Sequence, residues 1–117
     1  TAEGKVITMT EKEVSQMVKS VGFSTAYHHF EEGQEPGKPY LVYLYPETNN
    51  FSADGIVYQG INKLDLELYT DIKDLEAEKR VEAVLKEHGF FYEKTEAYLE
   101  SEKMYEVLYE MEVLINE

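Results

Sequence analysis

Cysteine is absent from this sequence of 117 residues, and so is tryptophan. Without cysteine the chain can form neither disulfide bonds nor a thiolate metal site, and it has no cysteine nucleophile. No apolar run approaches the roughly 20 residues of a membrane-spanning helix, and the N-terminus has no basic segment followed by an apolar stretch. We therefore expect a chain suited to a reducing cytoplasm, with no export signal of its own.

Positive charge is scarce. Arg80 is the single arginine, and 11 basic residues stand against 24 acidic ones, which gives a net charge of −13. Affinity for nucleic acid comes largely from clustered cations that contact phosphates, and the sequence has no such cluster. The same charge would repel an anionic lipid surface. We expect neither direct nucleic-acid binding nor membrane binding.

Apolar and aromatic residues are plentiful by contrast, since hydrophobic residues make up 43% of the chain and ten residues are tyrosine. This composition differs from that of disordered chains, and the length allows one hydrophobic core but hardly two. We expect residues 1–117 to form a single domain, in which residues 1–9, which show no clear period, are a flexible tail.

Two amphipathic helices are predicted. Thr10 and Glu13 form a capping-box pattern at the start of the first helix, and Gly22 can adopt the left-handed conformation that ends it. Asp71 or Asp74 can cap the second helix. Each helix carries one apolar stripe at helical spacing. The stripes consist of Val14, Met17, Val18 and Val21 in the first helix, and of Ala77, Val81, Val84, Leu85 and His88 in the second.

Five strands are predicted where apolar residues alternate with polar ones or run continuously. They cover residues 24–31, 40–45, 56–69, 90–99 and 103–115. Short connections between neighbouring strands favour antiparallel pairing. We therefore expect an α+β fold with the order α-β-β-β-α-β-β, in which two helices pack on one face of a mainly antiparallel sheet.

Acidic residues gather on one face of two predicted strands, 56–69 and 103–115, opposite the apolar face. They are Asp65, Glu67, Glu106, Glu110 and Glu112. Because like charges directly opposite each other across strands are destabilising, we expect these two strands to be separated by another strand or offset. The acidic face is interpreted either as an ordinary solvated surface or as a surface that repels a polyanion.

One cluster has the residue types of a metal or acid–base site. It consists of His28, His29, Glu31 and Glu32. Adjacent residues on a strand point to opposite faces, so we do not expect His28 and His29 to converge on one ion. The sequence has neither a nucleophile-elbow serine nor a phosphate-binding glycine loop. We expect no catalytic, cofactor-binding or metal-binding residues, and a protein that is not an enzyme.

All ten tyrosines lie on predicted strands, more than so small a core can hold. Tyrosine is enriched in the cores of protein interfaces, because it buries a large area and keeps a polar group. Ordinary core packing together with a preference for strands is an equally good explanation. The pattern therefore leaves an oligomer interface and a tyrosine-rich core as alternatives.

The connection from Pro46 to Gly55 is longer than a hairpin requires, since two residues suffice for that purpose. Long loops often carry function, although a plain surface loop is the alternative interpretation. We expect this segment and the strand before it to form a protein interface. The expected interface residues are Tyr43, Tyr45, Asn49, Asn50, Phe51 and Asp54.

Four segments resemble small prophage proteins of Gram-positive bacteria, which are encoded among the head-to-tail joining and tail genes of long-tailed phages. The segments are HFEEGQ at 29–34, YLVYLY at 40–45, NNFSADG at 49–55 and EKMYEVLYE at 102–110. The likeness is one of general pattern over about residues 10 to 115. The expected order of elements is similar to that of siphophage tail-terminator and tail-completion proteins.

The resemblance implies a structural protein that forms a hexameric ring on the end of the tail tube. Such a ring stops tube growth and offers a surface to the head connector, so its partners are copies of itself, the tail tube and the connector. DNA passes through the ring without being gripped, and an acidic lumen suits that passage. The resemblance further implies assembly in the host cytoplasm and a place in the virion. It supplies no active-site residues.

Two other functions compete with this one. An acidic bacterial protein-binding or regulatory module could use its charge to mimic DNA. An enzyme that uses His28 or His29 with a nearby carboxylate ranks last, because the expected strand geometry separates the two imidazoles.

We predict that Phe51→Ser leaves the monomer folded and weakens ring formation or tail attachment. An apolar anchor that docks on a neighbouring subunit contributes to assembly and not to the core. The melting temperature, the mass in solution and the yield of joined virions check this. Normal assembly with normal stability would contradict the docking role, and a collapse in stability would place Phe51 in the core.

Overall fold

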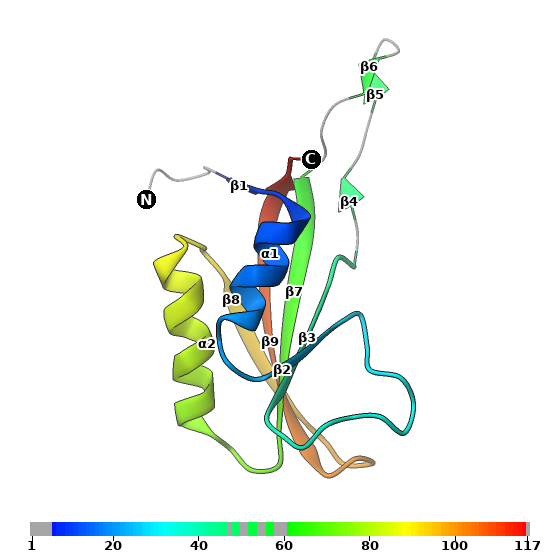
Figure 1. Cartoon of the computed structure of the whole chain (residues 1–117), viewed down its shortest axis with the longest axis vertical. Coiled ribbons are helices and arrows are strands. Elements are labelled where there is room, and N and C mark those ends of the chain that lie inside the picture. The colour runs from blue at the N-terminus through cyan, green and yellow to red at the C-terminus, as the bar shows by residue number, and fades with distance from the viewer. Residues whose placement is uncertain (1–5, 47, 50–51, 54–55, 58–60, 117) are drawn as a thin grey trace.

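The computed structural model describes residues 6–46, 48–49, 52–53, 56–57 and 61–116. Figure 1 shows two helices packed on the same side of one twisted sheet, with an extended arm that leaves the sheet at one end. Within the described residues, neither helix is long and apolar enough to cross a membrane. The predicted α+β class is confirmed, with two helices on one face of the sheet.

Helix α1 (Glu11–Lys19) begins as its sequence predicts. The Thr10 hydroxyl oxygen accepts a hydrogen bond from the Glu13 amide at 3.1 Å, and the Glu13 carboxylate accepts one from the Thr10 amide at 2.9 Å. Two of the amides that a helix start leaves without partners are thereby satisfied. Beyond the helix, Gly22 has a φ of +103°, a conformation that glycine adopts without strain. The capping-box prediction is confirmed.

Helix α2 (Leu75–Glu87) is capped by Asp74, whose carboxylate accepts a hydrogen bond from the Ala77 amide at 3.1 Å. Its residue Arg80 connects the two helical segments. The guanidinium donates to the Val21 carbonyl at 2.7 Å and lies 4.5 Å from the centre of the Phe23 ring. A Cβ atom at Gly22 would lie 2.4 Å from Arg80 Nη2, so this contact also requires a glycine there.

Seven strands form the main sheet, in the order β1-β9-β7-β3-β2, with β8 also paired to β9 and β4 also paired to β7. The strands are β1 (Ile7–Met9), β2 (Ser24–Tyr27), β3 (Tyr40–Leu44), β4 (Thr48–Asn49), β7 (Ile61–Thr70), β8 (Glu93–Leu99) and β9 (Met104–Ile115). A separate two-stranded sheet is formed by β5 (Ser52–Ala53) and β6 (Ile56–Val57).

The sheet is mixed, which corrects the expectation of a mainly antiparallel one. Strand β1 runs parallel to β9, and β2 runs parallel to β3. Residues 28–39 connect the end of β2 to the start of β3. They are long enough to return the chain to the end of the sheet at which β2 began, as a parallel connection requires. Strand β1 precedes α1, so the predicted order is only partly matched, and Ile7–Met9 form a strand rather than part of a tail.

Two predicted segments have different boundaries. The strand predicted over residues 24–31 ends at Tyr27, because His28 takes a φ of +73° and turns the chain. The strand predicted over residues 56–69 is divided into β6 and β7. The segment predicted as a loop from Pro46 to Gly55 contains β4 and β5, so it forms one side of the extended arm in Figure 1.

The core lies between the helices and the inner face of β7 and β9. Leu66 pairs with Tyr109, and both side chains are 1% exposed or less. The apolar stripes of both helices pack against this face, except that Val84 is only partly buried and His88, predicted as part of the second stripe, is exposed. Tyr109 therefore lies on the apolar face of β9, opposite its acidic face. We expected the predicted strands 56–69 and 103–115 to be separated by another strand or offset. This expectation is wrong, because β7 and β9 are directly paired over the whole of β7.

A polar network joins α2 to β8 on the helix-covered side of the sheet. Glu78 is only 3% exposed, and its carboxylate lies 2.7 Å from Lys73 Nζ and 2.9 Å from Lys94 Nζ. Lys94 also reaches Glu82 at 2.6 Å, and Glu82 accepts a hydrogen bond from the Tyr109 hydroxyl at 2.9 Å. Burial acts to raise the pKa of Glu78, but its bonds to the two lysines outweigh burial and hold that pKa below the ordinary 4.5.

We predict that Glu78→Ala lowers the free energy of unfolding at pH 7 by about 2 kcal/mol, because Lys73 and Lys94 lose the buried carboxylate that they share. A carboxyl group whose pKa is lower in the folded state stabilises the fold above its unfolded pKa, and this stabilisation is lost as the pH falls through the folded pKa. Urea denaturation from pH 7 to pH 3 should therefore show a weaker acid dependence for the variant.

The matched control is Glu76→Ala, on the exposed side of the same helix, which should change stability by no more than about 0.5 kcal/mol. Equal effects of the two substitutions would contradict a special role for the buried carboxylate.

Candidate functional site

The residues expected to form an interface fall in different places. Tyr43 and Tyr45 are partly buried against the core, and the Tyr27 ring lies 5.3 Å from the first and 5.9 Å from the second, measured between ring centres. Asn49 belongs to β4 in the arm. The remaining three, Asn50, Phe51 and Asp54, lie outside the described residues. The structure therefore does not test this set as an interface.

The two adjacent histidines lie together, which corrects the expectation that they point apart. Their Nδ1 atoms are 3.0 Å from each other. The strand alternation on which the expectation relied has ended at Tyr27, and the left-handed His28 turns its ring toward His29. Glu31 approaches His29 Nε2 at 3.9 Å, and both side chains are exposed. In the described part of the chain, no three histidine or acidic side chains are grouped so that they could hold a metal ion.

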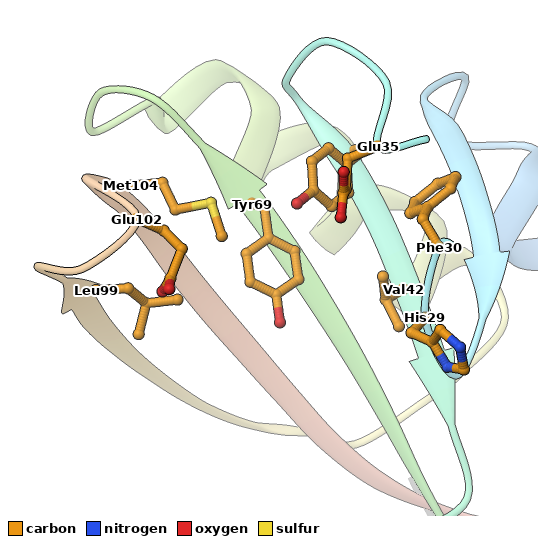
Figure 2. Close-up of a pocket in the computed structure, with 9 residues that line it drawn as sticks. His29, Phe30, Glu35, Val42, Tyr69, Leu99, Glu102 and Met104 are labelled. Carbon is orange, nitrogen blue, oxygen red and sulfur yellow. The ribbon is translucent and has the colours of Figure 1, made fainter. Parts of the chain in front are cut away.

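A hollow of about 260 Å³ lies on the outer face of the sheet, away from the helices. Figure 2 shows its lining side chains projecting from β3, β7 and the β8–β9 turn, with the loop after β2 on one side. The lining is mostly aromatic and aliphatic, with two carboxylates. It consists of His29, Phe30, Glu35, Tyr40, Val42, Tyr69, Leu99, Glu102 and Met104.

Aromatic rings build one side of this hollow. The Tyr40 and Tyr69 rings lie side by side on neighbouring strands, with centres 5.2 Å apart and planes tilted by 30°. Phe30, from the loop, meets Tyr40 edge-on at 5.2 Å. Such pairs add to the stabilisation that comes from burial alone. The Tyr40 ring is therefore packed between Phe30 and Tyr69, and Tyr40 is 6% exposed.

The Tyr69 hydroxyl lies between two carboxylates. Its oxygen is 2.8 Å from Glu67 Oε1 and 2.9 Å from Glu106 Oε2. A phenol has one hydrogen to donate, so it can serve only one carboxylate at a time. Burial raises the pKa of Glu67, and the charge of Glu106 raises it further, against the lowering effect of the hydrogen bond from Tyr69. Burial and the two carboxylates raise the pKa of Tyr69 as well, so the phenol stays protonated.

Further carboxylates face one another across the sheet, next to Glu67, Tyr69 and Glu106. The register places Asp65 opposite Glu110, and Glu110 opposite Glu93 on its other side. Like charges in such positions repel each other. No lysine or arginine of the described segments lies within ion-pair distance of Glu67 or Glu106. The outer face therefore combines aromatic surface with excess negative charge.

A comparison with solved structures finds a chain from the virion of a native gene transfer agent particle. The match has a TM-score of 0.60 at 12% sequence identity, and it covers 85% of this chain and 88% of that chain. This chain shares its fold with a virion component. Protein-family models and curated proteins give no match.

The geometry of the outer face favours binding over chemistry. It presents carboxylates and phenols, which accept hydrogen bonds and stack, and a shallow lining that leaves a ligand largely open to water. Sequence reasoning identified the acidic face but missed the hollow. The alternation of strand 56–69 places Tyr69 beside Glu67 on that face, but the neighbouring positions of Tyr40 and Met104 depend on strand pairing.

We predict that Glu67→Gln raises the free energy of unfolding at pH 7 by ~0.5 kcal/mol, the scale of one cross-strand like-charge contact. The folded pKa of Glu67 is raised, so the folded state binds more protons than the unfolded state, and stability falls as the pH rises from the ordinary 4.5 through the folded pKa. Glutamine does not ionise, so the variant lacks this fall in stability with rising pH, and its side-chain oxygen can still accept the Tyr69 hydrogen bond.

Urea denaturation at pH 7 and at pH 4 measures the difference between the variant and the natural chain, which should shrink at the lower pH. The control is Glu76→Gln on α2, where the side chain is exposed. A stabilisation of Glu67→Gln that is the same at both pH values would contradict the raised pKa.

Proposed function

We propose that this chain is a structural subunit of a phage-like particle that works by assembling with other particle proteins. The observation that carries the proposal is the shared fold with a virion chain over most of the length of both. The sequence supports it through its likeness to prophage proteins of the head-to-tail joining region. Because one fold serves many functions, the role within the particle needs its own evidence.

The specific role that we propose is that of a tail terminator or tail-completion protein, which acts as a ring between the tail tube and the head connector. Three features support it. The net charge of −13 suits a wall past which DNA moves without being gripped. The arm formed by β5 and β6 extends beyond the main sheet, where it can reach a neighbour (Figure 1). Tyr43 and Tyr45 lie on the chain that leads into this arm.

A role without catalysis is part of the same proposal. The histidine pair is exposed and makes its contacts with itself and with Glu31. The tyrosines with the largest rise in pKa, Tyr69 and Tyr109, stay protonated at neutral pH and are not activated as bases or nucleophiles. Assembly by protein contacts needs none of these groups to react.

We predict that deleting the coding sequence from the element that encodes this chain abolishes joined particles. Electron microscopy of the lysate should show heads separated from tails, and tails of uneven length if the ring stops tube growth. Expression of the chain in trans should restore joined particles. Joined particles of normal form without the chain would refute the structural role.

The state of the purified protein provides an independent measurement. Light scattering should give a mass of about six times 13.6 kDa if the ring forms alone, and images of the same sample should show an open centre. A monomer at all concentrations would show that the ring needs the tail tube as a template or does not form, and addition of purified tubes distinguishes these outcomes. Binding of restriction or repressor proteins instead of tubes would favour the acidic DNA-mimic alternative.

A further inference from the structure

We propose that the outer-face hollow binds an arginine in a basic segment of a partner protein. The surface of this chain that would bind the partner consists of the hollow and of Glu67 and Glu106, whose carboxylates lie at the hydroxyl of the lining residue Tyr69. The inference rests on the proposed function only for the source of the segment, which would be a neighbouring particle protein. The binding itself is a property of the isolated chain.

The first argument is the shape and chemistry of the lining. Tyr40 and Tyr69 present an aromatic wall, and Leu99 and Met104 close the opposite side in Figure 2. An arginine side chain matches this combination, since its aliphatic stem packs on apolar surface and its planar guanidinium stacks on aromatic rings. Glu35 and Glu102, both exposed, stand at the rim where the rest of a basic segment would pass.

The second argument is charge complementarity beside the hollow, at the Tyr69 hydroxyl. Glu67 and Glu106 share the single hydrogen of the Tyr69 hydroxyl, so this site has more acceptors than donors. A guanidinium offers five N–H donors in a rigid fork, and its hydrogen bonds to carboxylates are among the stronger ones in proteins. It would supply the donors that the chain does not provide at this position and would relieve the repulsion between the two carboxylates.

Within the described residues, no lysine forms an ion pair with Glu67 or Glu106, although Lys63 lies on the same strand as Glu67 and Lys103 lies in the turn beside Met104. Lys38, in the loop beside the hollow, pairs with Asp71 at 3.2 Å. Lys73 and Lys94 hold Glu78 on the opposite, helix-covered side of the sheet. A cation from another molecule can therefore occupy this position. A nucleic acid cannot provide it, because its phosphates carry the same sign of charge as this face.

The test uses the whole chain and two blocked pentapeptides, Gly-Arg-Gly-Arg-Gly and Gly-Lys-Gly-Lys-Gly. Nuclear magnetic resonance at low salt should show that the arginine peptide shifts the Met104 and Leu99 methyl signals and the Tyr69 ring signals in a saturable manner. Glu106→Gln should weaken this binding about tenfold, the effect of losing one charge-assisted hydrogen bond. Glu87→Gln, an equal loss of charge on the exposed face of α2, should change it by less than about twofold.

Three results would overturn the inference. They are shifts spread evenly over the acidic residues of α2 and the sheet, equal affinity for the lysine peptide, and unchanged affinity of Glu106→Gln. Should Glu106→Gln lower the melting temperature, Glu102→Gln at the exposed rim serves as the second variant, with a smaller loss of affinity expected. Because no particle is needed, failure of this experiment leaves the deletion test of the proposed function unaffected.

Discussion

The antiparallel ladder between β7 and β9 is the constraint on which the rest of this structure depends. Its register sets Leu66 against Tyr109 on the inner face, and the two helices then pack on that apolar surface. Because side chains alternate along a strand, the same register places Asp65 against Glu110 on the outer face. A slip of one residue would relieve the acidic contact but would turn the apolar rows toward water. Burial of the core, which involves many side chains, outweighs the repulsion between a few carboxylates.

The carboxylates on the two faces of the sheet have different environments. On the helix side, Glu78 is almost fully buried and receives two lysines, so its pKa is lowered and its charge is stabilised. On the outer side, Glu67 and Glu106 share one phenol hydrogen, and the pKa of Glu67 is raised. The first arrangement is complete within the monomer. The second gains from an additional cation, and such local conflicts are typical of functional sites.

The proposed function draws on two separate surface features. The arm that contains β5 and β6 reaches beyond the main sheet, while the outer face presents aromatic and acidic groups around Tyr69. The chain shares its fold with a virion chain, and the proposed function assigns both features to contacts with other particle proteins. Neither feature contributes to the core between the helices and the sheet, so each can change its partner without loss of the fold.

Local sequence determined the elements whose signals lie within a few residues. Thr10 and Glu13 fixed the start of α1, and the alternation around Tyr109 fixed the faces of β9, because capping and side-chain period are properties of the segment itself. Tertiary structure decided which strands are neighbours, since pairing joins residues far apart in sequence. It made β7 and β9 direct partners, created two parallel pairs, and ended β2 at a left-handed His28. The outer-face hollow arises only from that pairing, because its walls come from strands and a loop that no local pattern brings together.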